Sequence, residues 1–229
     1  MPLSSVGEKF SGIGMTSTRT RARMVERLRE QGIRDEAVLA AMAAVPRHIF
    51  VEEALAIRAY EDSPLPIGAG QTISQPYVVA RMTELLRAGR APATVLEIGT
   101  GCGYQTAILA QIAGEVYTVE RVHSLVAKAR KNLRALKVTN VRIKHGDGSA
   151  DLREELEVDA ILVTAATTRV PTALLRYLRT GGRMVLPLAR HDGELKETQL
   201  LTVIEKTPGG IREHAYDAVR FVPLLSGLA

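Results

Sequence analysis

Apolar residues recur at helical spacing in two stretches near the start of the chain. The first runs from residue 17 to Gly32, and the second runs from Asp35, a side chain suited to a helix N-cap, to Pro46. Residues 1–16 show no periodicity, so we expect a flexible N-terminal arm, in which Met15 offers a second possible start. Residues 64–76 then hold three Pro and two Gly, which predicts a loop of the kind that often carries function.

Beyond residue 77 helical stripes alternate with short strand-like runs. Strands are predicted over 94–98, 116–119, 141–144, 160–164, 183–186 and 200–205, and helices over 78–86, 107–112, 124–136 and 172–178. Repeated βα units predict an α/β fold with a doubly wound, mostly parallel, Rossmann-like sheet covered by helices on both faces. Segment 213–225 is strand-like without a helix before it, which predicts an antiparallel edge strand. We expect one domain over 17–229, with a helical part and the loop over 17–90 and the sheet over 91–229.

Composition narrows the class of protein. Of the 229 residues, 46% are hydrophobic and 24% are charged, as in ordinary folded proteins. A single Cys excludes a disulfide framework and a Cys-x-x-Cys pair, which favours a reducing compartment. The first residues do not resemble a secretory signal, and no run of about 20 apolar residues could span a bilayer. We therefore expect a cytoplasmic protein with no membrane partner.

The chain is basic, with 30 Lys and Arg against 25 Asp and Glu and a pI near 9.5, which raises nucleic acid as a partner. Residues 121–144 carry eight basic side chains and no acidic one. That stretch holds no aromatic residue, and only 4% of the chain is aromatic, so platforms for stacking unpaired bases are scarce. We interpret the stretch as a solvated helix face and do not expect a nucleic-acid partner.

A glycine-rich turn follows the first strand of the alternation. Segment 95–103, VLEIGTGCG, places Glu97 ahead of Gly99, Thr100, Gly101 and Gly103. Glycines let the backbone turn sharply and approach a ligand, and the next helix offers free N–H groups at its start. A dinucleotide fingerprint would have its third Gly one residue later. The segment resembles the cofactor turn of class I S-adenosylmethionine-dependent methyltransferases.

That resemblance implies roles for acids at three strand ends. Glu97 would face the methionine ammonium of S-adenosyl-L-methionine, directly or through water. Glu120, about 20 residues further on, would accept hydrogen bonds from both ribose hydroxyls. Asp147, next to Gly148, would accept one from the adenine amino group. Each acid alone could equally be a surface carboxylate, but the three together with the glycine turn favour a cofactor site.

The Pro- and Gly-rich loop narrows the resemblance further. Segments 45–51 (VPRHIFV), 59–68 (AYEDSPLPIG), 70–76 (GQTISQP) and 221–224 (FVPL) closely resemble protein-L-isoaspartate O-methyltransferases, and the likeness extends over 17–225. It implies an enzyme that methylates the free α-carboxylate of L-isoaspartyl residues in damaged proteins and peptides, its partners. The ester would close to a succinimide, whose hydrolysis restores some normal aspartate. We expect a monomeric repair enzyme.

The implied chemistry makes few demands on the protein. A carboxylic acid with a pKa of about 4 is ionised at neutral pH, so its attack on a sulfonium methyl needs no general base. The enzyme must align the reactants and exclude water. By the resemblance Ser74 is the catalytic residue that orients the carboxylate, with Thr72 and Ile73 beside it binding substrate. Ser74 could instead be a helix N-cap, because Pro76 follows two residues later.

Several other features bear on the site. Cys102 is interpreted as a small packing residue, because no base for a thiol nucleophile is identifiable. The five His residues show neither an i, i+4 pair nor a His-Glu-x-x-His pattern, so no metal is expected. Where the family usually has Trp and a second aromatic residue, this chain has Ser149 and Val158 with the charged stretch 151–157 between them. The adenine side of the site is therefore expected to differ.

Two other functions stay open. The basic stretch suggests an RNA or small-molecule acceptor, although residues 164–167 (TAAT) lack the Asp/Asn-Pro-Pro-aromatic motif that amino-methylating enzymes commonly carry. A methyltransferase-like fold could also bind cofactor or protein termini without catalysis.

Overall fold

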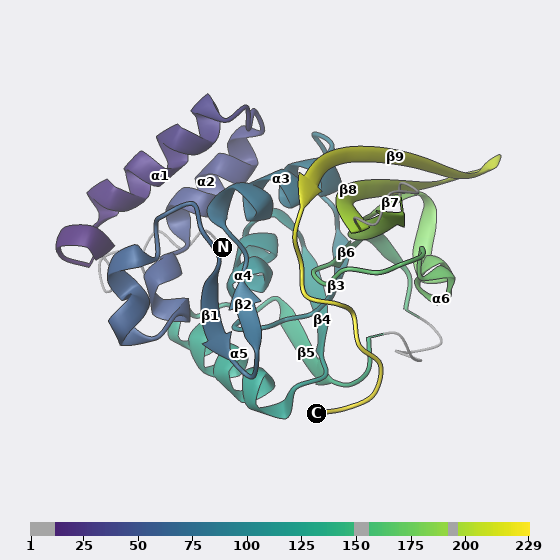
Figure 1. Cartoon of the computed structure of the whole chain (residues 1–229). Coiled ribbons are helices and arrows are strands. Elements are labelled where there is room, and N and C mark those ends of the chain that lie inside the picture. The colour runs from purple at the N-terminus through teal and green to yellow at the C-terminus, as the bar shows by residue number, and fades with distance from the viewer. Residues whose placement is uncertain (1–11, 149–155, 192–196) are drawn as a thin grey trace.

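A computed structural model describes residues 12–148, 156–191 and 197–229, and its centre is a seven-stranded sheet (Figure 1). The helices are α1 (Thr18–Glu30), α2 (Glu36–Ala44), α3 (Pro76–Arg87), α4 (Tyr104–Ile112), α5 (His123–Ala135) and α6 (Thr172–Leu175). The strands are β1 (Leu65–Gly68), β2 (Gln71–Ile73), β3 (Thr94–Ile98), β4 (Glu115–Glu120), β5 (Val141–His145), β6 (Val158–Val163), β7 (Leu178–His191), β8 (Glu197–Thr207) and β9 (Gly210–Val219).

The large sheet has the order β5-β4-β3-β6-β7-β8-β9. Strands β5, β4, β3, β6 and β7 run parallel, and β8 and β9 continue the sheet antiparallel from β7. This confirms the predicted doubly wound, mostly parallel sheet with an antiparallel edge strand. Because the order of the strands along the sheet reverses between β3 and β6, the carboxyl ends of these two parallel strands open onto a crevice where ligands of such folds bind.

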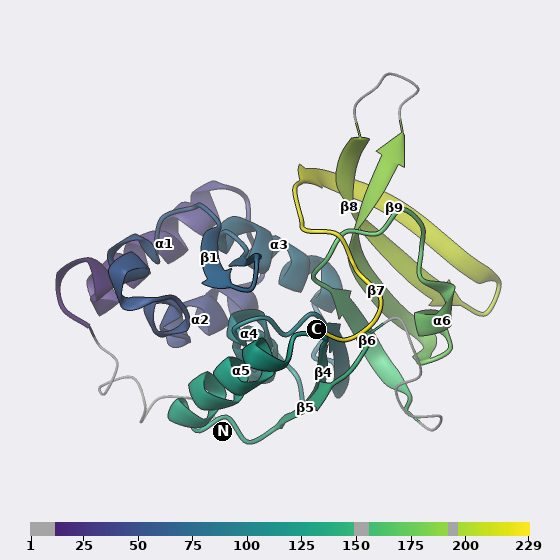
Figure 2. The same cartoon turned by 60° about the horizontal axis from the view of Figure 1, so that its bottom comes forward.

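Alternating side chains of the strands face two hydrophobic cores. Val95 and Leu162 point to the face covered by α1–α5, whereas Leu96 and Ile161 point to the face that carries α6. Figure 2 shows this division, with α1–α5 on one side of the sheet and α6 on the other. The core under α1–α5 takes residues from both the helical part and the sheet, so the two pack as neighbours.

The two predicted N-terminal helices are present as α1 and α2. Asp35 Oδ1 accepts hydrogen bonds from the first backbone N–H groups of α2, at 2.9 and 3.3 Å, which makes Asp35 the predicted N-cap. Behind α2, the guanidinium of Arg47 is fully buried 4.9 Å from the ring centre of Tyr104 and donates to the carbonyl of Ala59 at 2.8 Å. Arg47 thus joins the N-terminal part to α4 beside the sheet.

The predicted loop over 64–76 is wrong in one respect, because it contains the antiparallel hairpin β1–β2. Gly68, Ala69 and Gly70 all have positive φ, which lets the chain reverse within a few residues. Leu65 and Ile67 alternate into the core beneath the hairpin, and this burial holds β1 in place although it contains Pro66 and Gly68.

Two predicted boundaries at the far end of the chain are also wrong. The helix over 172–178 ends at Leu175, because Leu178 already pairs with Val158 as the start of β7. The edge strand ends at Val219 and not at residue 225. There the side-chain amide of Gln199 takes the place of a strand partner, accepting from the N–H of Phe221 at 2.6 Å and donating to its carbonyl at 3.2 Å.

Three sequence expectations fall wholly or partly outside the described residues. They are the first part of the N-terminal arm, Ser149 and most of the charged stretch 151–157. Val158 is described and is fully buried at the start of β6. Among the described residues no helix is both long and apolar enough to cross a membrane.

Candidate active site

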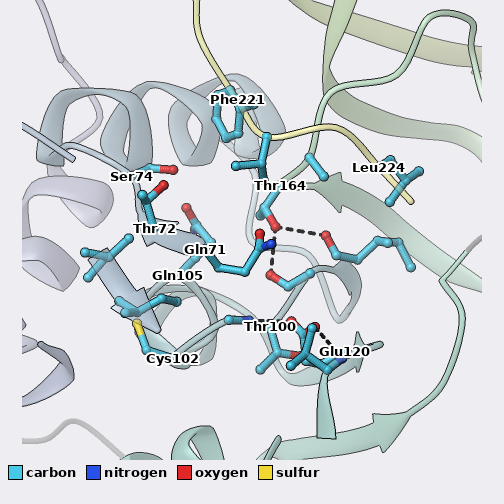
Figure 3. Close-up of a pocket in the computed structure, with 18 of the residues that line it drawn as sticks. Gln71, Thr72, Ser74, Thr100, Cys102, Gln105, Glu120, Thr164, Phe221 and Leu224 are labelled. Atoms are coloured by element: carbon cyan, nitrogen blue, oxygen red, sulfur yellow. Dashed lines mark hydrogen bonds between the residues drawn. The ribbon is translucent and has the colours of Figure 1, made fainter. Parts of the chain in front are cut away.

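A cavity lies over the carboxyl ends of β3, β4 and β6, and six separate stretches of the chain line it. Figure 3 shows Ser74 and Thr72 at its upper left and Thr100 and Glu120 at its lower edge. Its lining comprises Ile67, Gln71–Ser74, Val79, Met82, Ile98–Cys102, Tyr104, Gln105, Val119–Val122, Gly148, Thr164, Ala165 and Phe221–Leu225. The glycine turn, the hairpin, the end of β6 and the last segment of the chain therefore surround one space.

The glycine turn brings its backbone to the cavity floor. Gly99 has φ +96°, a conformation that favours glycine, and a Cβ there would lie 2.3 Å from Thr164 Oγ1. The Thr164 hydroxyl is a donor 2.7 Å from the carbonyl of Gly99, so the ends of β3 and β6 touch directly. A side chain at position 99 would both strain the turn and fill the space beside the cavity.

The carboxylate of Glu120 binds the backbone of the glycine turn from the end of β4. Its carboxylate is 6% exposed and accepts hydrogen bonds from the N–H of Gly101 at 2.8 Å and from the N–H of Val122 at 2.9 Å. Each carboxylate oxygen keeps a further lone pair directed away from these donors. Glu120 lines the cavity and offers it an acceptor of fixed orientation.

Glu97 lies beneath the turn and is absent from the cavity lining. The carboxyl is fully buried, and Thr106 and Thr118 each donate to its Oε2 at 2.6 Å. Burial raises the pKa of Glu97 to about 8, with the charge of Glu120 adding to the rise, so the group holds a proton at neutral pH. Thr118 is also 2.6 Å from the hydroxyl of Thr100, which does line the cavity. A hydrogen-bonded chain thus connects Glu97 to the cavity floor.

The last segment of the chain leaves β9 and runs back past β6 to end near β4 (Figure 2), and its residues 221–225 line the cavity. Backbone hydrogen bonds join Ala166 to Val222 and Leu224, and Ala229 to Arg121 and His123, at 2.7 to 2.9 Å. Asp147 is absent from the cavity lining, and its Oδ2 accepts from the N–H of Gly227 at 2.6 Å. Asp147 therefore holds the segment that covers the cavity.

A groove adjoins the cavity on the outer side of the hairpin and α3. It is lined by Pro64, Thr72, Ser74, Gln75, Tyr77, Val78, Thr164 and Ala218–Val222. The groove and the cavity share five residues, which are Thr72, Ser74, Thr164, Phe221 and Val222. Among the described residues that line this groove, Arg220 is the only one with a charged side chain, and no carboxylate opposes it there.

Ser74 stands at the junction of the two hollows without capping α3. The N-cap of α3 is Gln75, with no side-chain hydrogen bond, and Pro76 occupies the first turn. Among the described residues no hydrogen bond to the Ser74 hydroxyl is observed. The geometry thus removes the alternative in which this hydroxyl serves as a helix cap, and it leaves the hydroxyl available at the junction.

The structure brings most of the expected site residues to the cavity. Those in its lining are Thr72, Ile73, Ser74, Gly99, Thr100, Gly101, Glu120 and Gly148, and those outside it are Glu97, Gly103 and Asp147. Gly103 instead forms the N-cap of α4. Lining residues that sequence reasoning missed include Gln71, Gln105, Thr164 and Phe221–Leu225. The FVPL motif at 221–224 was a usable signal, but nothing local indicated that it pairs with the segment after β6.

Cys102 lines the cavity as a buried residue, and burial raises the pKa of its thiol. Its backbone carbonyl accepts from the Asn132 amide at 2.9 Å. A thiol held in its neutral form is a poor nucleophile, which fits the packing role expected for it.

This doubly wound sheet, with an acid beside a glycine turn at its first parallel strand, places the protein among the class I methyltransferases. The family model for protein-L-isoaspartate(D-aspartate) O-methyltransferase matches residues 19–229. A protein-L-isoaspartate O-methyltransferase of Dechloromonas aromatica is 62% identical over 94% of this chain and 98% of its own, and one of Methylobacillus flagellatus is 57% identical over 95% and 97%. The chain belongs to the protein-L-isoaspartate O-methyltransferase family.

Solved structures agree with this assignment. A crystal structure assigned as the Plasmodium falciparum enzyme, in complex with S-adenosyl-L-homocysteine, has a TM-score of 0.74 at 28% identity and covers 90% of this chain and 98% of that one. A second protein-L-isoaspartate O-methyltransferase has a TM-score of 0.78 at 26% identity, over 91% of this chain and 67% of that one.

Proposed function

We propose that this chain transfers a methyl group from S-adenosyl-L-methionine to the free α-carboxylate of L-isoaspartyl residues in damaged proteins and peptides. The ester then closes to a succinimide, which begins repair. The observation that carries the proposal is the junction at Ser74, where the cavity beside the glycine turn and the open groove share one wall. A methyl donor in the cavity and a peptide in the groove would meet at this place.

The residues of the cavity fit S-adenosyl-L-methionine. Gly99 and Gly101 allow close approach of the backbone, and Glu120 presents a fixed acceptor for ribose hydroxyls. The Oε1 atom of Glu97 is buried without a partner among the described residues, so the carboxyl beneath the turn has unused hydrogen-bonding capacity. When bound, the cofactor supplies a methyl group on a positively charged sulfur. The same fit supports the roles expected for Thr100 and Gly148, whereas Gly103 and Asp147 would act from outside the cavity, Gly103 as the N-cap of α4 and Asp147 through the covering segment.

The chain itself needs to position an anion and keep water away. The Ser74 hydroxyl can donate one hydrogen bond to the substrate carboxylate, while Thr72 and Ile73 shape the wall beside it. Phe221 and Val222 cover the junction with apolar surface, which excludes water that would solvate the nucleophile. No histidine occurs in the described lining of either hollow, in keeping with a carboxylate that is already ionised and requires no base.

The lining of the groove fits a carboxylate as methyl acceptor better than an amine or a nucleic acid. Thr164 and Ala165 stand where an amino-methylating enzyme would present polar and aromatic side chains. Arg220 gives the groove lining a positive charge that attracts an anionic substrate. The basic helix α5 is partly engaged within the protein, because Lys128 donates to the carbonyl of Ile67 at 2.9 Å.

Cytoplasmic location and a monomeric state belong to the same proposal. The single, buried Cys102 supports a reducing compartment, and light scattering of the purified protein would measure the expected monomer.

The experiment that tests the function compares two synthetic peptides that differ only in carrying L-isoaspartate or L-aspartate at one position. Labelled S-adenosyl-L-methionine should methylate the isoaspartyl peptide alone. Cofactor binding without transfer to either peptide would overturn the proposal and favour a non-catalytic binding protein or a different acceptor.

A further inference from the structure

A hydrogen bond bridges the two walls of the groove beside Ser74. The hydroxyl of Tyr77, in the first turn of α3, donates to Asp217 Oδ1 at 3.0 Å. Tyr77 itself lines one wall, and Ala218 to Val222, which follow Asp217 directly, line the other. The bond therefore joins the groove wall that contains Ser74 to the opposite wall, which contains Phe221.

Local irregularity of β9 directs Asp217 toward α3. Leu200 pairs with Ala218 and Thr202 with Ala215, so Tyr216 and Asp217 together oppose the single residue Leu201. Such a bulge inserts one extra residue and redirects the side chains around it, and bulges occur often next to active sites. Here it lies where the edge strand turns into the segment that covers the cavity.

The carboxylate of Asp217 is held in place by a second partner. Arg81 Nε donates to Asp217 Oδ2 at 2.9 Å, and Arg81 Nη1 donates to Glu84 one turn further along α3 at 2.8 Å. Asp217, Arg81 and Glu84 are all partly buried, with 29%, 24% and 16% of their side chains exposed. Hydrogen bonds from Arg81 and Tyr77 outweigh the effect of burial and lower the pKa of Asp217, so it stays charged at neutral pH.

We propose that Asp217 is a positioning residue for the peptide substrate, which sets the width of the groove by clamping the β9 end to α3 through Tyr77 and Arg81. This inference rests on the proposed function, because it takes the groove as the peptide site. Asp217 lines neither the cavity nor the groove, so it acts through Tyr77 and through Ala218 to Val222. Loss of these bonds from Asp217, which we call the clamp, loosens the groove wall formed by Ala218 to Val222 and leaves the floor of the cofactor cavity intact.

The test combines Tyr77→Phe, Asp217→Ala and the double variant with two measurements. The first is the Kd of a fluorescent isoaspartyl peptide in the presence of S-adenosyl-L-homocysteine, which needs no turnover. The second is kcat and KM for methylation of the same peptide. Each single variant should raise the peptide Kd and KM about tenfold, as expected for loss of a hydrogen bond to a charged group. The double variant should do no worse than Asp217→Ala, because both changes remove the same bond.

A matched control uses another charged residue of the same strand. Glu213 pairs with Arg190 on the exposed surface of the sheet and lines neither hollow, so Glu213→Gln should leave the peptide Kd within twofold. The Kd of S-adenosyl-L-homocysteine should also stay within twofold in all variants. A merely structural role would instead weaken cofactor binding and lower the melting temperature in step with peptide binding, and that outcome overturns the proposal.

The two proposals can fail separately. Wild-type protein that binds the isoaspartyl peptide in the groove without methylating it contradicts the proposed function, while the effect of Asp217→Ala on peptide Kd still decides the clamp. Unchanged peptide Kd and KM in Asp217→Ala, with methylation intact, overturns the clamp alone.

Discussion

The carboxylate of Glu120 reaches across the glycine turn and accepts a hydrogen bond 2.8 Å long from the backbone N–H of Gly101. Its other oxygen accepts from the N–H of Val122, so both oxygens are fixed by the backbone. Strand β4 is thereby tied to the turn that follows β3, and the remaining lone pairs face the cavity. One side chain both fixes the turn and presents the acceptor that we propose for the cofactor ribose.

Replacing Glu120 with Gln should weaken S-adenosyl-L-homocysteine binding by at least about tenfold. The amide nitrogen cannot accept, so either Gly101 or Val122 loses its partner, and a hydrogen bond to a charged group is worth about 1.5–3 kcal/mol. Isothermal titration calorimetry would measure the Kd. Glu115→Gln, at the opposite end of β4, is the control, and equal affinities in the two variants would contradict the assignment of Glu120.

Ser74→Ala should lower kcat for the isoaspartyl peptide by about 10- to 100-fold, because a single hydrogen bond to an anion in a dry site contributes roughly 1.5–3 kcal/mol. Cofactor affinity should not change, since Ser74 makes no hydrogen bond that supports the turn. Ser74→Thr keeps a hydroxyl and should retain part of the activity. If Ser74→Ala reacts at the wild-type rate, the hydroxyl does not orient the carboxylate.

The position of the β1–β2 hairpin should depend on Lys128 of α5. Its ammonium donates to the carbonyl of Ile67 at 2.9 Å, and Ile67 lines the cavity beneath the hairpin. Lys128→Met removes this tie while keeping most of the apolar stem, so we expect KM for the peptide to rise several-fold. Lys131→Met, on the exposed face of the same helix, is the matched control in steady-state assays. Similar KM values for both variants would show that the hairpin needs no such tie.

Periodicity located β3, β4 and β6 well because each is a short and mostly buried run. Strand β3 spans residues 94–98 as predicted, and the glycine turn follows it. The alternation of side chains between the two faces of β3 also indicates the direction of the Glu97 side chain. Side chains two residues apart lie on the same face of a strand, so Glu97 shares a face with Val95, which packs under the helices. This alternation predicts that the Glu97 carboxyl points beneath the turn, where Thr106 donates to it.

Contacts between distant segments could not be predicted from local pattern. Asp147 meets Gly227, and Phe221 comes to lie beside Ser74, only because β7–β9 form an antiparallel meander that returns the chain to the crevice. Nothing in the spacing of residues 213–225 encodes where that strand stops, since the Gln199 side chain decides it from the neighbouring strand. The acids and the loop were therefore identified from sequence, while the covering segment and the groove required the fold.

The buried carboxyl of Glu97 should make the ligand-free protein less stable as the pH rises. Burial raises its pKa to about 8, whereas an unfolded Glu titrates near 4.3, at about the value of a free side chain. The folded state therefore keeps a proton that the unfolded state releases between these two values. The contribution of Glu97 is complete below about pH 4.3 and declines by up to about 1.4 kcal/mol per pH unit until the folded group also ionises near pH 8.

Glu97→Gln places a neutral group at this position at every pH and should remove that dependence. Urea unfolding of both proteins at pH 5.5, 6.5 and 7.5 would give the difference in unfolding free energy, from which the titration of all other groups cancels. We expect the wild-type value to fall relative to the variant across this range, with Glu115→Gln showing no such trend. Parallel curves for wild type and Glu97→Gln would mean that Glu97 is already ionised in the folded protein, and its carboxylate would then carry a negative charge beneath the glycine turn before any cofactor binds.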